Sequence, residues 1–202
     1  MARKGQAYST AIADSINAFL KEDEWRFDFD SECGRFIFNL GLSCKLKSVR
    51  YIVDVREKDY LIYVFSPLGP DKGDAATMKR TAEFLTRANY GLVFGNFEMD
   101  MHDGEIRYKT FVPCGGEAPC ADVIRRSIYV PAMMLDRYGD GLLKVLYSDI
   151  EPEKACSMCE NDLRDGADDD TEESGSTNDS TADILSRLSA HFSSDTSDTE
   201  DE

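Results

Sequence analysis

The sequence predicts an α+β domain over residues 1–148, followed by a disordered acidic tail over 149–202. In the first part, apolar and polar residues alternate in several short runs, which indicates half-buried β-strands. In other runs the apolar residues recur every three or four positions, which indicates amphipathic helices. In the second part both periodicities disappear, and Asp, Glu, Ser, Thr and Gly dominate. Such a composition buries too little apolar surface to fold.

The charge divides at the same place. The formal net charge of the 202 residues is −16. Residues 149–202 hold 18 acidic and three basic residues, whereas 1–148 hold 21 acidic and 20 basic ones. Without concentrated Lys and Arg, neither nucleic acid nor an anionic membrane surface is an expected partner. The start of the chain lacks the apolar stretch of a signal peptide, so we expect a cytoplasmic protein whose six cysteines are free thiols.

A first helix is expected over 6–21, because its apolar residues recur at helical spacing. Alternating residues then predict extended structure, with a hairpin closed at the polar turn 57–59. These extended runs lie at 25–29, 36–42, 49–55 and 60–64.

Asp74 is placed to cap the N-terminus of a second helix, whose apolar stripe runs from Met78 to Ala88. A last helical stripe crosses 119–148, where Pro131 is expected to introduce a kink. With a further hairpin between these helices, the element order is α-β-β-β-α-β-β-α in an antiparallel sheet.

That further hairpin is centred on Asp103–Gly104, a dipeptide typical of two-residue turns. A two-residue turn sets Asp100 opposite Arg107 and Glu98 opposite Lys109. Opposite charges then meet on one face and apolar residues on the other, so two rules predict the same register.

The 49–65 hairpin has an unusual second face. If it closes with a two-residue loop, one face is wholly apolar and is the natural core side. The other face is also partly apolar, which is typical of a protein-contact surface. Either a second copy of the chain or the long C-terminal helix is expected to cover it. The residues of this candidate contact face are Ile52, Leu61, Tyr63 and Phe65.

Nothing in the sequence predicts catalysis. The chain has two histidines, His102 and His191, and neither stands in a recognisable triad. No phosphate-binding, dinucleotide-binding, nucleophile-elbow or zinc-protease motif occurs. We therefore expect no enzyme activity, no cofactor and no bound metal.

The CxxC motif at 156–159 supports an alternative function. Cys156 and Cys159 could bind zinc or act as a redox pair, but a structural zinc site needs four ligands. The nearest further thiols, Cys114 and Cys120, have an unusual spacing for such a site.

The acidic tail contains one apolar cluster. Its members would share a face of a short helix over 182–192, which is too short to be stable alone and would form only on docking into a groove. The alternative is a chance cluster. The four residues are Ile184, Leu185, Leu188 and Phe192.

The runs at 84–91, 95–98 and 103–105 resemble the YbjN-domain family. The resemblance covers about residues 6–148, and it implies the fold of type III secretion chaperones. It also implies a sensory-transduction regulator without catalytic residues, similar to chaperones that form homodimers and bind extended client segments. The function we expect is therefore a non-catalytic, chaperone-like protein-binding or regulatory module that forms a homodimer.

Overall fold

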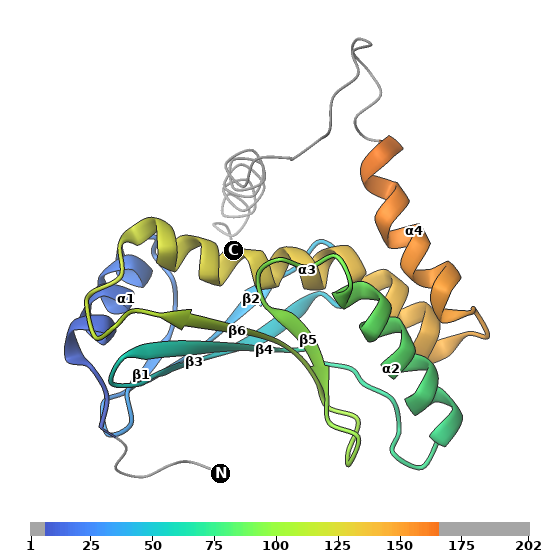
Figure 1. The fold of residues 1–202 in the computed structure, drawn as a ribbon, viewed down its shortest axis with the longest axis horizontal. Coiled ribbons are helices and arrows are strands. Elements are labelled where there is room, and N and C mark those ends of the chain that lie inside the picture. The colour runs from blue at the N-terminus through green and yellow to red at the C-terminus, as the bar shows by residue number, and fades with distance from the viewer. Residues whose placement is uncertain (1–6, 166–202) are drawn as a thin grey trace, which may run out of the picture. The chain divides into compact units, whose positions relative to one another are not determined.

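The computed structural model describes residues 7–165, which form four helices and one sheet (Figure 1). The α+β class and the antiparallel sheet are confirmed. Two elements are added to the expected order, a short first strand and a helix after the predicted domain end. The elements are α1 Thr10–Glu22, β1 Asp28–Asp30, β2 Arg35–Gly41, β3 Ser48–Val55, β4 Asp59–Phe65, α2 Ala75–Asn89, β5 Asn96–Met99, β6 Ile106–Pro113, α3 Ala121–Tyr147 and α4 Pro152–Asp165.

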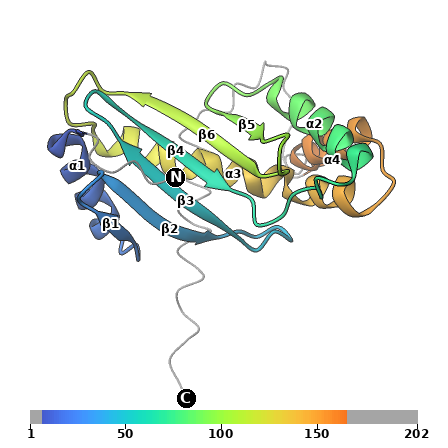
Figure 2. The same ribbon diagram turned by 90° about the horizontal axis from the view of Figure 1, so that it is seen from below.

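The six strands form one sheet in the order β1-β2-β3-β4-β6-β5, and every neighbouring pair is antiparallel. Helix α3 runs across one face of this sheet, and in Figure 2 the strands lie in front of it. The hydroxyl of Tyr51 on β3 donates to the carbonyl oxygen of Ile128 on α3 at 2.8 Å. None of the described helices lies on the opposite face, which we call the open face.

The local signals read at helix ends and at the first hairpin are confirmed. The carboxylate of Asp74 accepts from the backbone N–H groups of Ala76 and Thr77, which caps α2. In the β3–β4 hairpin the N–H of Arg56 donates to the carbonyl oxygen of Asp59 at 2.8 Å, so the loop closes around two residues, the case that sets the predicted contact face on one side of the hairpin. Pro131 lies inside α3, yet the helix continues to Tyr147.

The predicted register of the β5–β6 hairpin is wrong by two residues. Glu98 pairs with Arg107, and the backbone N–H of Asp100 donates to the carbonyl oxygen of Glu105 at 2.9 Å. The turn is therefore longer than two residues, and Gly104 takes a φ of +83° in it. The Asp100 carboxylate accepts from the N–H of His102, which stabilises the longer loop. Because the shift is even, the paired residues of β5 and β6 stay on the faces predicted for them, whereas Met101, which the two-residue turn set opposite Ile106, lies exposed in the turn.

The predicted start of the disordered tail at 149 is also wrong, because α4 belongs to the domain. Ala155, Cys156 and Cys159 are buried in the common core. The Arg80 guanidinium donates to the carbonyl oxygens of Ser148 and Ile150 at 2.6 and 2.7 Å, and so holds the connection before α4. The buried residues of α4 are small and stand among charged ones, which is why its sequence resembles the tail. The expected helix of Ile184, Leu185, Leu188 and Phe192 lies outside the described residues, as does His191.

Candidate functional site

The open face brings together all four residues of the predicted contact face. In the β3–β4 ladder Ile52 pairs with Tyr63, and Leu61 and Phe65 lie two residues away on β4. Of the two coverings expected for this face, the one by the long C-terminal helix is not found. That helix, α3, packs on the other face, where its residues bury Tyr51, Tyr60 and Ile62.

Two further apolar residues extend this surface. Ile37 on β2 pairs with Ile52, and Phe111 on β6 pairs with Leu61. Sequence reasoning missed both, because their place on the face depends on pairing between distant segments. The Phe111 side chain is 52% exposed, a large value for an aromatic residue in a sheet. We call this set the open-face patch: Ile37, Ile52, Leu61, Tyr63, Phe65 and Phe111.

The patch is tightly packed within the sheet although no described helix covers it. Leu61 is only 5% exposed, so its neighbours on adjacent strands shield it. The rings of Tyr63 and Phe65 lie 6.5 Å apart, and the Arg107 guanidinium lies 4.7 Å from the Tyr63 ring centre. These contacts fix the aromatic side chains in place before any partner arrives, which lowers the entropy lost on binding.

Ion pairs border the patch on both sides. On β2 and β3, Arg35 and Asp54 approach to 2.9 Å. On β5 and β6, Glu98 binds Arg107 at 2.7 Å and Lys109 at 2.8 Å. Partial burial alone would raise the pKa of Glu98, but the hydrogen bonds from Lys109 and Arg107 outweigh it and lower that pKa. An apolar centre with a charged border is the usual anatomy of a protein–protein interface.

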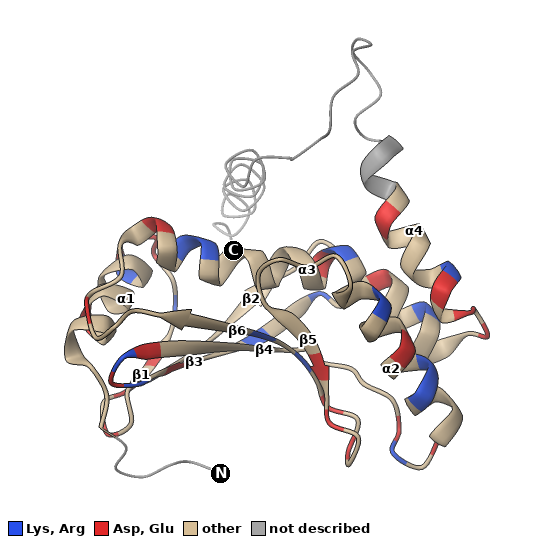
Figure 3. Ribbon diagram, in the orientation of Figure 1, with Lys and Arg blue, Asp and Glu red and all other residues tan. Residues whose placement is uncertain are grey.

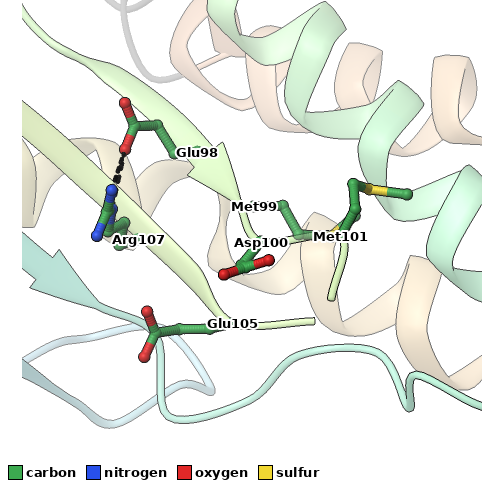
Figure 4. A pocket seen from close by; sticks show the side chains of 6 residues that line it. All are labelled: Glu98, Met99, Asp100, Met101, Glu105 and Arg107. Carbon is green, nitrogen blue, oxygen red and sulfur yellow. Dashed lines mark hydrogen bonds and ion pairs between the residues drawn. The ribbon is translucent and has the colours of Figure 1, made fainter. Parts of the chain in front are cut away.

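A polar pocket of about 500 Å³ lies at the β5–β6 end of the sheet (Figure 4). Acidic residues gather at this hairpin (Figure 3), and of its carboxylates only Glu98 forms an ion pair within the described residues. Over residues 7–165, no group of three or more His, Cys, Asp or Glu side chains could hold a metal ion. The pocket can therefore attract a cationic group but offers no metal site. Its lining residues are Glu98, Met99, Asp100, Met101, Glu105 and Arg107.

The four cysteines of the alternative function do not come together. Cys159 packs against Gly141 of α3, whereas Cys120 precedes the first residue of the same helix. The twenty residues of α-helix between those two positions span about 30 Å. Cys114 follows β6, at the same end of α3 as Cys120.

The CxxC thiols are also poorly suited to react. Cys156 and Cys159 are both buried on α4. Burial, and next the nearby Glu160 carboxylate, raise the pKa of Cys156 to about 12. A thiol that stays protonated is a weak nucleophile and a weak metal ligand. The structure therefore places this motif in the core packing between α3 and α4.

Among residues 7–165, no helix combines the length and the apolar character that a membrane span requires.

Comparison with known protein families agrees with the resemblance seen in the residues. Residues 13–144 match the model of the YbjN family, which is described as "Putative bacterial sensory transduction regulator". No match is found among the curated proteins. The matched segment begins in α1 and ends in α3, and so includes all six strands and the whole open-face patch. Since the match spans more than half of the chain, the chain belongs to the YbjN family.

Proposed function

We propose that this protein is a non-catalytic regulatory module that acts by binding proteins, and that it forms a homodimer through its open face. The observation that carries the proposal is the apolar patch on a sheet face that no described helix covers. The family description supports a regulatory role. The resemblance to type III secretion chaperones supports a chaperone-like role, in which the dimer binds an extended client segment. None of the six cysteines forms a disulfide, which suits the cytoplasm.

The size of the face suits a dimer. The strands are three to eight residues long, and at about 3.3 Å per residue and about 4.8 Å between strands they cover about 600 Å² in projection. A standard interface buries about 800 Å² per partner, so a dimer of that size would use the whole open face and part of its border. Burying about 400 Å² of apolar surface in total contributes about 10 kcal/mol before the loss of rotational and translational freedom is subtracted. Because that loss is of similar size, the polar contacts around the patch decide the affinity.

The test is the mass of the full chain in sedimentation velocity at micromolar concentration. We expect a dimer for the natural sequence and a folded monomer for the double variant Tyr63→Asp, Phe65→Asp. An acidic side chain that is buried in the interface without a partner would destabilise the dimer, whereas in the monomer water solvates the same side chain.

Tyr90→Asp is the matched control, because Tyr90 is 97% exposed at the end of α2 and is not part of the sheet. It should leave the dimer intact. A natural chain that sediments as a monomer would contradict the proposal, and so would a double variant that remains dimeric.

A further inference from the structure

Several exposed charges on the open face form no ion pair with a described residue. Arg50 on β3 is exposed and forms no ion pair with any described residue. Asp100 and Glu105, at the end of the β5–β6 hairpin, are exposed and equally without an ion pair in this part of the chain. Arg50 therefore lies on one side of β4, and the carboxylates of Asp100 and Glu105 lie on the other. Two further carboxylates on this face, Asp28 and Asp30, belong to β1 at the opposite edge of the sheet, two strands from Arg50.

Strand register places all three groups on the same face as the patch. Arg50 pairs with Phe65, so the two side chains point the same way. Phe65 also pairs with Arg107 of β6, and Glu105 lies two residues before Arg107. The hydrogen bond from the Asp100 N–H to the Glu105 carbonyl oxygen continues the β5–β6 ladder beyond its last strand pair, so Asp100 lies opposite Glu105. Side chains two residues apart on a strand share a face.

We propose that the two subunits meet around a two-fold axis that runs along β4, so that Arg50 of each subunit binds the carboxylates of Asp100 and Glu105 in the other. This inference rests on the proposed dimer and defines its geometry. In a two-fold contact the same surface serves both subunits, so a cation on one side of the axis that binds an anion on the other side makes this contact twice.

The strand order supports this axis. The centre of the patch lies on β4, at Leu61, Tyr63 and Phe65. An axis along β4 therefore packs the centre of the patch against the centre of the same patch in the partner subunit. The neighbours of β4 are β3 and β6, and the axis therefore sets β3 of one subunit over β6 of the other. On β6, Arg107 stands at the same level as Arg50, because both residues pair with Phe65. Glu105 lies two residues, or about 7 Å, before Arg107, a distance that an extended arginine side chain can cover.

Arg107 stands at the level of Arg50 on β6, and its charge has to be considered. The Nε and Nη2 atoms of Arg107 both donate to the Glu98 Oε2 atom, and the guanidinium lies over the Tyr63 ring. Its charge is thus already matched within its own subunit. The carboxylates of Asp100 and Glu105 have no such partner in the described chain, so they remain available to Arg50 of the partner subunit.

Charge reversal tests this pairing. The first variant is Arg50→Glu, and the second is Asp100→Lys with Glu105→Lys. Each alone sets like charges against each other at two places in the dimer, so we expect its dissociation constant to rise about tenfold or more. Lys79→Glu is the matched control, because Lys79 is exposed on α2 and the same charge change there should have no effect.

The decisive experiment mixes the two variants and measures heterodimer by native mass spectrometry, with one variant carrying a mass tag. In the heterodimer both contacts again join opposite charges, so heterodimer should exceed both homodimers and approach the natural affinity. A mixture with no more heterodimer than either homodimer would overturn this geometry. If Tyr63→Asp with Phe65→Asp still breaks the natural dimer in that case, the proposed function stands and only the axis is wrong.

Discussion

The side chain of Asn89 caps the free edge of the sheet by binding both backbone groups of Phe97. Its amide oxygen accepts from the Phe97 N–H at 2.7 Å, and its amide nitrogen donates to the Phe97 carbonyl oxygen at 3.0 Å. Phe97 lies on β5, the last strand of the sheet. Exposed strand edges are prone to pair with other chains. Asn89, the last residue of α2, thus occupies the position that a further strand would take.

Asn89→Ala should destabilise the domain by about 1–3 kcal/mol, because it leaves the Phe97 N–H without a partner and removes one of the two side-chain donors to the Phe97 carbonyl oxygen. Urea unfolding measures the change. Asn17→Ala on α1 is the control, since no side-chain hydrogen bond of Asn17 would be lost. An equal effect of the two substitutions would show that the cap contributes nothing.

Gly141→Ala should also destabilise the domain, although Ala usually favours a helix. A methyl group at position 141 would collide with the Sγ atom of Cys159 and would lie 3.1 Å from the Phe84 ring. We expect a loss of about 1–3 kcal/mol, typical of overpacking, and partial recovery on adding Cys159→Ala.

Gly91→Ala is the matched control, because a methyl group there meets nothing within 4 Å. It should be neutral or slightly stabilising. Gly141→Ala without any loss in thermal or urea unfolding would mean that α4 does not pack against α3 as described.

Removing α4 should weaken the fold much more than removing the residues after it. A chain ending at residue 150 loses the buried side chains of Ala155, Cys156 and Cys159. We expect its melting temperature to fall by about 10 °C or more, whereas a chain ending at residue 165 should melt close to the full chain. Calorimetry of the three chains makes the comparison. Equal melting of the 150- and 165-residue chains would contradict the packing of α4.

The sequence was sufficient wherever structure is determined by near neighbours. The Asp74 cap depends on a few adjacent residues, and the sequence predicts it. The contact face follows from the two-residue case of the β3–β4 loop, which is the case observed, because the loop length assigns every side chain of a hairpin to a face. The error in the β5–β6 turn left the faces of the paired strand residues correct, since it was an even number of residues.

Features that depend on distant segments could not be predicted. Phe111 joins the patch only because β6 pairs with β4, across the whole of α2. The burial of Cys156 depends on a surface formed by α2 and α3, and nothing in the acidic sequence around it reveals that surface. The division of charge on the open face likewise required the strand order, which places β6 between β4 and β5.

Alkaline pH should destabilise the fold through Cys156. Its pKa is raised from 9.0 to about 12, first by burial and then by Glu160. The contribution of the protonated thiol to stability is complete below pH 9, the pKa expected after unfolding, and is lost as the pH rises towards 12. Cys156→Ala should therefore flatten the decline in stability between these values, as measured by urea unfolding at a series of pH values.

The reactivity of the thiols provides the control for this prediction. Cys120 is exposed, so iodoacetamide should modify it in the native protein. Cys156 should react at a comparable rate only after unfolding. Fast native modification of Cys156 at pH 8 would show that its thiol is accessible and that the described burial is incorrect.

Side-chain oxidation by hydroxyl radicals tests the central claim most directly, because it examines the open face in the unmodified full chain. Phe111 is 52% exposed in one subunit, and Tyr90, at 97%, serves as an internal reference outside the sheet. As the protein concentration rises, we predict that Phe111 becomes protected while Tyr90 reacts at a constant rate. Equal reactivity of Phe111 at all concentrations where the chain sediments as a dimer would show that the subunits meet elsewhere, and would contradict the proposed role of the open face.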